Sequence, residues 1–357
     1  MSNAWLELLS LLAVALLAAL HYAFWTRRLA VPTHEDELVH ATAADGWRLA
    51  LGRRRPRGAP RLPPVLLVHG IAMNRQAFDF GVERYSVAAD LARAGFDCFA
   101  LDLRGSGGSR EPPSRAARRW DLDTYLREDL PAALDQIRAL TGSPDVLYVG
   151  HSQGAILGMA ACELYPDRVR ALVAIAGPAH FDVQERLKKL VELRRYPLGR
   201  FLRVLARMVA PFAGYWHPVA VDLAINSRNV ERPVYRRMLV NALENLQPGV
   251  LEQFAAFIRE DSFRSMDGKE DYRALLASCT QPALFLSAEK DGLAPPSVVE
   301  SAFRRWGGPK RYWCFGGDYG HTDLLVGRNA PEVVFPKIRE FLLEQSAEVA
   351  GVRAART

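Results

Sequence analysis

Short apolar runs rich in β-branched residues alternate along the chain with segments whose apolar residues recur at helical spacing. Helices are predicted over 83–94, 123–140 and 154–165. Buried strands are predicted in "PPVLLVHG", "DCFALDLRG", "DVLYVGH", "VRALVAIAG", "PALFLSAEKDG" and "KRYWCF". This order predicts an α/β fold with a mostly parallel sheet and helices on both faces. Upstream, "ELVHATAADGWRLALGRRR" predicts two further strands around the turn Asp45-Gly46.

The alternation stops for about a hundred residues, from Pro178 to roughly Ser278. A connection of that length predicts an inserted domain, here a helical cap. Within it, "RFLRVLARMVAPF" places arginines on one face of a helix and apolar residues on the other. The basic face holds Arg200, Arg203 and Arg207. The apolar face holds Phe201, Leu202, Leu205, Met208 and Val209. We expect the apolar face to pack on the protein; contact of the basic face with acidic lipid is the alternative.

The N-terminus carries eighteen residues, from Leu8 to Trp25, without Asp, Glu, Lys or Arg. At 1.5 Å per residue this run just spans a bilayer core of about 30 Å. A cleavable signal peptide is less favoured, because no Lys or Arg precedes the run and no small-x-small site follows it; a buried helix is a third possibility. Arg27 and Arg28 follow the run, so we expect a single-pass anchor with the catalytic domain in the cytoplasm.

These patterns divide the chain into five parts. We expect an anchor at 1–30, the first part of an α/β core at 31–177, the helical cap at 178–278, the second part of the core at 279–345, and a tail at 346–357.

Composition narrows the function classes. The chain has 357 residues, 49% of them hydrophobic, which is enough for a sizeable core. Its formal charge of +6 comes mainly from dispersed arginine without a nucleic-acid motif, so no nucleic-acid partner is expected. The four cysteines are far apart and have no Cys-x-x-Cys spacing, which favours buried free thiols over a metal site. The glycines of "DLRGSGGS" lack the dinucleotide-binding spacing, and no metal or other cofactor is expected.

The candidate nucleophile is Ser152, in Gly150-His151-Ser152-Gln153-Gly154. It lies between a predicted buried strand and a predicted helix, which is the setting of the Gly-x-Ser-x-Gly nucleophile elbow. A turn this sharp strains the serine backbone, and glycines two residues on either side avoid collisions with the strand and the helix. The hydroxyl is then exposed at the edge of the sheet.

A serine hydroxyl needs a base, and the base needs a group that holds its tautomer. His321 lies in the loop after the last strand, and Asp291 ends the strand before it. The chain order Ser152, Asp291, His321 is the order of the elbow enzymes. Asp318 and Asp323 are competing acids, but each would have to fold back along its own loop to reach the His321 ring.

Acyl transfer also needs two donors that face the developing oxyanion. We expect one to be the backbone N–H of Gln153, at the start of the helix after the elbow, where the helix dipole adds positive potential. The other is expected from Ile71, which follows "VLLVHG". We expect His69 to brace that loop by hydrogen bonding.

Taken together, "HG", "DLRGSGGS", "GHSQG", "KDG" and "GH" fall in the order found in α/β-hydrolases, and the chain resembles that superfamily from about Leu62 to Leu343. "GHSQG" and the long helical insert are similar to lysosomal and gastric acid lipases. "LLVHGIAMNRQAFDF" and "HTDLLVGRNAPEVVFPKI" are similar to polyhydroxyalkanoate synthases, whose elbow residue is cysteine. Epoxide hydrolases and haloalkane dehalogenases carry Asp there, so Ser152 disfavours all three of those chemistries.

The resemblance implies that Ser152 attacks an ester carbonyl and that water activated by His321 hydrolyses the acyl-enzyme. We therefore expect a membrane-anchored esterase or lipase for hydrophobic acyl esters or lipids. An acyltransferase with the same triad is the alternative, and an inactive binding scaffold is disfavoured by the intact triad. We also expect apolar residues of the cap to line a slot for the acyl chain: Phe201, Leu205, Met208, Phe212 and Trp216.

Overall fold

A computed structural model of the chain describes residues 3–59, 62–112, 119–181, 188, 192, 197–215 and 223–354. One eight-stranded sheet organises it, in the order β1-β2-β4-β3-β5-β6-β7-β8. The strands are β1 (Glu37–Thr42), β2 (Arg48–Arg54), β3 (Val65–Val68), β4 (Cys98–Leu101), β5 (Val146–His151), β6 (Val169–Ile175), β7 (Ala283–Ala288) and β8 (Lys310–Phe315). The first two strands pair antiparallel, as does β2 with β4, and all other pairs are parallel. The predicted α/β class is confirmed.

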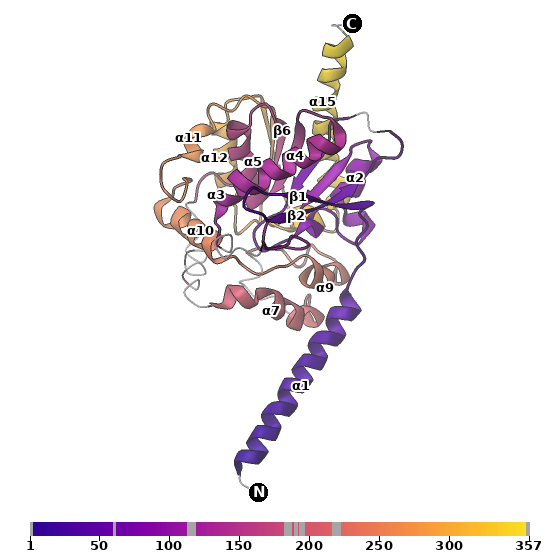
Figure 1. Cartoon of the computed structure of the whole chain (residues 1–357), viewed down its shortest axis with the longest axis vertical. Helices are drawn as coiled ribbons and strands as arrows, with labels where there is room; N and C mark the ends of the chain where they lie inside the picture. The colour runs from indigo at the N-terminus through magenta and orange to yellow at the C-terminus, as the bar shows by residue number, and fades with distance from the viewer. Residues whose placement is uncertain are drawn as a thin grey trace.

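Helices cover the sheet on both faces, as Figure 1 shows. Those that belong to the α/β order are α2 (Val87–Arg93), α3 (Leu122–Thr124), α4 (Leu130–Thr141), α5 (Gln153–Leu164), α12 (Pro296–Arg305), α13 (Asp323–Val326), α14 (Ala330–Val333) and α15 (Phe335–Ala354). The central strands are buried on both faces because they carry apolar residues without interruption, for example in β3 and β5.

The predicted helices differ from the observed ones in detail. The helix expected over 83–94 is a 3-10 turn, Glu83–Tyr85, followed by α2, because the Ser86 hydroxyl accepts from the N–H of Ala89 and starts a new helix there. The helix expected over 123–140 contains a π-helical turn, Tyr125–Asp129, between α3 and α4. The predicted tail is helical as far as Ala354, and 355–357 lie outside the described residues.

Between β6 and β7 the described residues contribute no strand to the sheet, which agrees with the predicted helical insert. Its helices are α7 (Leu202–Val209), α9 (Arg232–Asn241), α10 (Pro248–Glu260) and α11 (Tyr272–Leu275). The 3-10 turns Pro197–Phe201 and Ala210–Phe212 flank α7.

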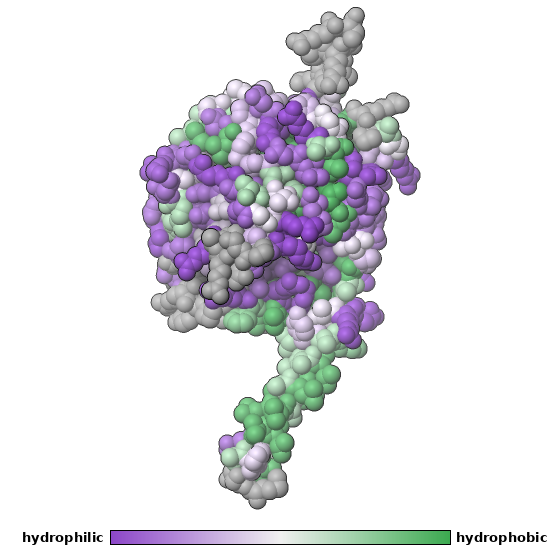
Figure 2. Space-filling view, viewed as in Figure 1, coloured by the Kyte–Doolittle hydropathy of each residue, from purple (hydrophilic) through white to green (hydrophobic). Residues whose placement is uncertain are grey.

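The N-terminal apolar run is one helix, α1 (Asn3–Leu29), which projects from the body of the molecule (Figure 1). It is long and apolar enough to cross a membrane, and a signal sequence passes the same test. Its exposed side chains form a continuous apolar surface along the projection (Figure 2). Its C-terminal end is anchored in the domain, because Leu29 is buried with Ala210 and Val240 of the insert.

Candidate active site

Ser152 occupies a strained turn between β5 and α5. Its backbone has φ 53° and ψ −118°, a region that residues other than glycine rarely adopt. The turn is held because the Ser152 N–H donates to the carbonyl of Ile175 on β6, at 2.8 Å. Ser152 is therefore placed, partly exposed, at the carboxyl edge of the parallel strands.

The two glycines of the motif allow close approach of three elements. A Cβ on Gly154 would lie 2.0 Å from the carbonyl oxygen of Val68 on β3. A Cβ on Gly150 would lie 2.3 Å from the carbonyl oxygen of Gly154. Both collisions are with backbone, which cannot move aside cheaply, so the collisions expected from the sequence are confirmed.

Asp291 and His321 meet at the same edge of the sheet. The Asp291 Oδ2 lies 2.7 Å from the His321 Nδ1, and both side chains are buried. The other oxygen, Oδ1, accepts the backbone N–H groups of Leu293 at 2.9 Å and Ala294 at 2.7 Å. A carboxylate on Nδ1 fixes the proton there and leaves Nε2 as the acceptor nitrogen of the neutral ring.

The competing acids have other partners. Asp318 pairs with Lys290 on the surface. Asp323 is buried, which raises its pKa, and it accepts from the Asn229 side chain and the Gly320 N–H, each at 2.8 Å. Neither carboxylate contacts the His321 ring among the described hydrogen bonds and ion pairs, so Asp291 is the acid that the structure brings to His321.

His151, the elbow residue before Ser152, contacts His321. Its Nε2 donates to the His321 carbonyl at 3.1 Å, and the centroids of the two rings are 4.7 Å apart. Burial, together with the neighbouring His321, lowers the pKa of His151 to about 3, so the ring is neutral. Within the described residues, Ser152 Oγ makes no hydrogen bond; catalytic hydrogen bonds often form only when substrate is bound.

The two predicted oxyanion donors line one cavity. Ile71, from the loop after β3, and Gln153, at the start of α5, both border it. The Gln153 N–H has no partner within the helix because it is the first helical residue. The cavity is also lined by polar side chains, and the buried Gln153 Oε1 has no hydrogen-bond partner. Those polar residues are His69, Arg104, Ser106, Glu244, Asn245 and Gln247.

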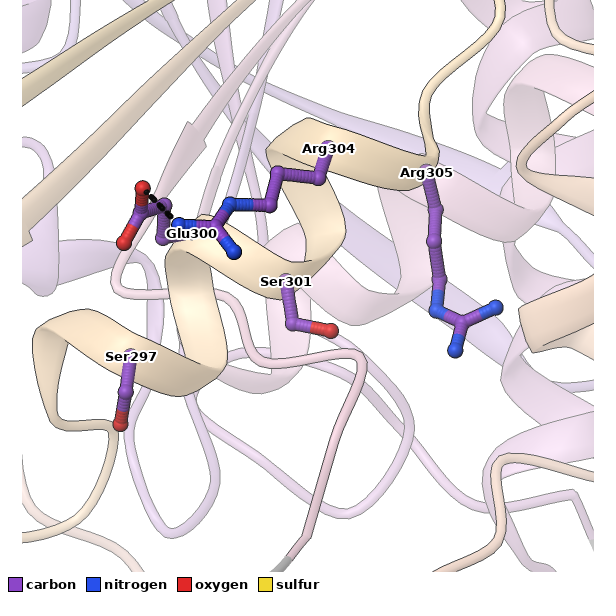
Figure 3. Close-up of a pocket in the computed structure, with 5 residues that line it drawn as sticks. All are labelled: Ser297, Glu300, Ser301, Arg304 and Arg305. Carbon is purple, nitrogen blue, oxygen red and sulfur yellow. Dashed lines mark hydrogen bonds and ion pairs between the residues drawn. The ribbon is translucent and has the colours of Figure 1, made fainter.

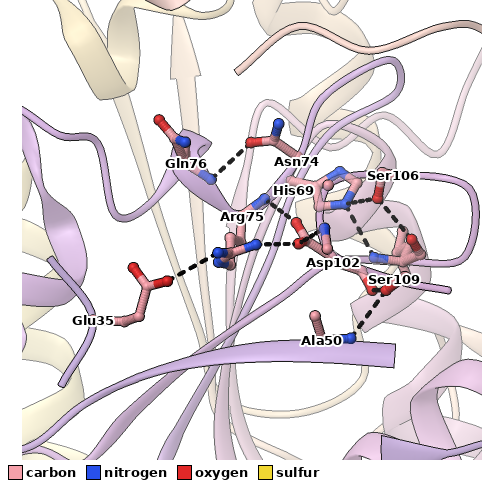
Figure 4. A network of polar contacts seen from close by, with 12 residues as sticks. Glu35, Ala50, His69, Asn74, Arg75, Gln76, Asp102, Ser106 and Ser109 are labelled. Carbon is pink, nitrogen blue, oxygen red and sulfur yellow. Dashed lines mark hydrogen bonds and ion pairs between the residues drawn. The ribbon is translucent and has the colours of Figure 1, made fainter. Parts of the chain in front are cut away.

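His69 braces the loop that carries Ile71, as expected. Its Nδ1 donates to the Gly70 carbonyl at 2.8 Å, and its Nε2 accepts the Leu103 N–H at 3.2 Å. Burial lowers its pKa, which favours this neutral form. The same loop is held by Asp102, which accepts the backbone N–H of Arg75 at 2.7 Å and pairs with its guanidinium (Figure 4).

Two buried polar residues in this region were not predicted. Asn74 Nδ2 donates to the Asn241 carbonyl at 2.8 Å and to Glu244 Oε1 at 2.9 Å. The backbones also pair: Asn74 N–H with the Ala242 carbonyl, and Glu244 N–H with the Ala72 carbonyl. The insert is thus attached to the loop that holds Ile71. No sequence motif marks the pairing, because its two sides are about 170 positions apart.

The structure does not bring the described cap residues predicted for the acyl-chain slot to the cavity beside Gln153. Phe201, Leu205 and Phe212 are exposed and Met208 is half-buried, and none of the four lines that cavity. The expected packing of α7 is also reversed. Two arginines of the predicted basic face turn toward the protein, since Arg203 pairs with Glu244 and Arg207 donates to the Val240 carbonyl, whereas Arg200, before α7, is exposed. Trp216, the fifth residue predicted for the slot, lies outside the described residues.

A second hollow lies along the outer face of α12 (Figure 3). Its charged side chains include Glu300 and Arg304, which form an ion pair at 2.8 Å one helical turn apart. None of the predicted site residues lies there, so it is a surface feature of one helix.

A mostly parallel sheet with a strained serine elbow and a buried Asp–His pair at its carboxyl edge defines a hydrolase of the α/β type. Residues 63–327 match the family model described as alpha/beta hydrolase fold, and the chain belongs to that family.

Several curated relatives are lipases. The chain is 30% identical over 352 residues to human lipase member K, covering 84% of this chain and 85% of that protein. It is 35% identical over 329 residues to triacylglycerol lipase 2 of Arabidopsis thaliana, covering 79% of this chain and 77% of that protein. Lipase 1 of Drosophila melanogaster is 32% identical over 151 residues, and the chain spans about a third of its length (34%). The resemblance to acid lipases is confirmed, and these findings support a carboxylic ester hydrolase.

Solved structures agree on the fold. A thermophilic esterase from Thermogutta terrifontis superposes with a TM-score of 0.60 at 22% identity, covering 87% of this chain and 99% of that one. A putative lipase from Acinetobacter baumannii gives a TM-score of 0.61 at 16% identity, covering 87% of this chain and 92% of that one.

Proposed function

We propose that the protein is a membrane-anchored serine hydrolase that cleaves hydrophobic carboxylic esters through an acyl-enzyme on Ser152. The observation that carries the proposal is the buried Asp291–His321 pair, at 2.7 Å, at the edge of the sheet where the strained elbow presents Ser152. Lipase relatives support a hydrophobic ester or lipid as the substrate.

In the proposed reaction, Ser152 Oγ attacks the ester carbonyl while His321 Nε2 takes its proton. The N–H groups of Gln153 and Ile71 stabilise the tetrahedral oxyanion. Asp291 stabilises the imidazolium, which then gives the proton to the leaving alcohol. Water, deprotonated by His321, attacks the acyl-enzyme and releases the carboxylic acid and free Ser152.

The packing of α1 supports its retention as an anchor. Asn241 Nδ2 donates to the Leu29 carbonyl at 3.0 Å, and Asn241 Oδ1 accepts the Val31 N–H at 3.2 Å. Cleavage of the helix would expose the apolar cluster of Leu29, Ala210 and Val240. The proposed division is an anchor (1–30), a core in two parts (31–177 and 279–345) and a helical cap (178–278). Arg27 and Arg28 favour a cytoplasmic catalytic domain.

The test is turnover of p-nitrophenyl esters from acetate to palmitate by the full-length protein in detergent, beside Ser152→Ala. The lipase relatives lead us to expect efficiency that rises from acetate to octanoate, and each methylene that the site buries would contribute about 0.8 kcal/mol. A steady decline beyond butyrate would restrict the enzyme to short esters. Product analysis with added alcohols separates hydrolysis, which releases free acid, from acyl transfer, which gives a new ester.

A further inference from the structure

The helix α7 and the turns beside it present an apolar face to solvent. Phe201, Leu205 and Phe212 are 54%, 47% and 60% exposed. The opposite side is buried: Ala206 and Ala210 face the domain. At 100° per residue, Leu205 and Val204 lie about 100° and 160° around the helix axis from Ala206. The exposed apolar residues, which we call the α7 apolar face, are Phe201, Val204, Leu205, Val209 and Phe212.

This arrangement is the reverse of an ordinary surface helix, which buries its apolar side. The polar side of α7 is occupied within the protein. Arg203 Nη1 lies 3.2 Å from Glu244 Oε2, and Arg207 Nε donates to the Val240 carbonyl at 3.1 Å. The helix cannot turn its apolar residues inward without breaking these contacts. Scattered apolar residues need no explanation, but a contiguous face does.

The α7 apolar face is continuous with α1. His21 Nε2 donates to the Met208 carbonyl at 3.0 Å, and the His21 ring stacks on Phe212 with the centroids 6.0 Å apart. Tyr22 accepts from Arg207 at 3.0 Å. Figure 1 shows α7 at the base of the domain beside the emerging α1, and Figure 2 shows apolar surface running from α1 onto that base.

The level of the contact along α1 matches the edge of a bilayer. The stretch from Ala4 to Leu20, N-terminal to the contact, is about 26 Å long at 1.5 Å per residue. A bilayer hydrocarbon core is about 30 Å thick. If α1 spans the membrane, α7 lies at the interface, where amphipathic helices insert their apolar side to a depth of roughly 5–10 Å. Arg27 and Arg28, less than two helical turns beyond Tyr22 on α1, and Arg200, next to Phe201, are exposed and suit anionic headgroups.

We propose that the α7 apolar face is a second membrane contact, which lies in the interface of a bilayer containing anionic lipid and holds the catalytic domain against it. The proposal rests on the proposed retention of α1 as an anchor. In this proposal the insert links the membrane to the candidate active site. The segment after α9 pairs with the loop that carries Ile71, through Asn74 and Glu244. Ester molecules in the bilayer would then reach the site without crossing bulk water.

The experiment uses the full-length protein in nanodiscs of phosphatidylcholine with one fifth phosphatidylglycerol. Cys314 is the exposed cysteine among the four, so Cys314→Ser gives the background. Single cysteines at Leu205→Cys, Leu12→Cys and Leu140→Cys carry a nitrobenzoxadiazole label. Leu12 reports on α1, and Leu140 lies in the last turn of α4, a helix that lies on the part of the domain away from α1 (Figure 1).

We expect dithionite to reduce the label at position 205 at least tenfold more slowly than the label at 140, and nitroxide-bearing lipid to quench it. Equal reduction at 205 and 140 with protection at 12 would overturn the second contact and leave the anchor standing. Rapid reduction at 12 would overturn the anchor and this inference together. Protection at 205 without quenching by nitroxide lipid would show cover by protein, and would also overturn it.

A kinetic comparison adds an independent readout. The variant Leu205→Ser/Val209→Ser should lose at least fivefold in kcat/KM on a long-chain ester in vesicles and stay within twofold on soluble p-nitrophenyl butyrate. Leu343→Ser, at an apolar residue of α15 that is 38% exposed, is the control and should change neither. An unchanged vesicle rate in the double variant would contradict the proposal.

Discussion

The contacts of Asp291 predict how a single-atom change would act on the reaction. Asp291→Asn keeps the size of the side chain and replaces one oxygen by an amide nitrogen. The Oδ1 position faces two N–H donors, those of Leu293 and Ala294, and therefore must remain an oxygen. The amide NH₂ of the variant is then forced toward His321 Nδ1, which was 2.7 Å from Oδ2.

A donor at that position reverses the tautomer of His321. Nδ1 must become the acceptor, so Nε2 carries the proton and cannot take one from Ser152. Restoring the productive tautomer would place two N–H groups against each other and would lose a charge-assisted hydrogen bond. We expect kcat/KM to fall by about 10³ to 10⁴-fold, or about 4 to 5.5 kcal/mol at 1.36 kcal/mol per tenfold.

The assay is hydrolysis of p-nitrophenyl butyrate by the detergent-solubilised protein from pH 6 to 9. Asp318→Asn is the matched control, because Asp318 has the same side chain in the neighbouring loop but pairs with Lys290 on the surface. It should remain within twofold of the parent protein. Activity of Asp291→Asn within tenfold of the parent would refute the assignment of Asp291 as the group that orients His321.

Three further predictions follow from close contacts and burial. Gly154→Ala should destabilise the fold by about 3 kcal/mol or more in thermal unfolding, since its Cβ would meet the Val68 carbonyl oxygen at 2.0 Å. The control is Gly316→Ala, whose Cβ would make only an ordinary contact at 3.5 Å. Equal unfolding midpoints for the two variants would contradict the packing argument. The pKa of His151 is lowered to about 3 by burial, so below pH 6.5 the unfolded chain binds a proton that the folded chain does not, and stability is lost as pH falls. The expected loss in the free energy of unfolding is about 2 kcal/mol at pH 5. His151→Gln should remove this loss when urea titrations at pH 7 and pH 5 are compared. If the free energy of unfolding of the variant still falls by the same amount between the two pH values, His151 is not the cause. Asn74→Ala should lower kcat about tenfold with little change in KM for a small ester, because it frees the loop of Ile71 from the insert; a change confined to KM would argue against positioning of the oxyanion donor.

Much of the fold could be predicted because each central strand is a short apolar run bounded by turn residues. The elbow could be predicted because its glycines answer a local steric demand, visible now in the contacts of Gly150 and Gly154. The pairing of Asp291 with His321 followed from chain order, since parallel strands bring their carboxyl ends to one edge.

The sequence did not predict which face of α7 packs on the domain. An amphipathic pattern over 200–209 specifies two faces but not which of them meets the protein. The tertiary partners decide this: Glu244 and the Val240 carbonyl attract Arg203 and Arg207 inward and leave the apolar residues outside. The role of Asn74 was equally hidden, because its partners come from a distant part of the chain.

Covalent labelling can show whether Ser152 is the nucleophile. The full-length protein is treated with a fluorophosphonate probe and digested, and the modified peptide is identified by mass spectrometry. We expect a single modification on Ser152 that is absent in Ser152→Ala and at least a hundredfold slower in His321→Ala. Labelling of another residue, or undiminished labelling of Ser152→Ala, would contradict the assignment of Ser152 as the nucleophile.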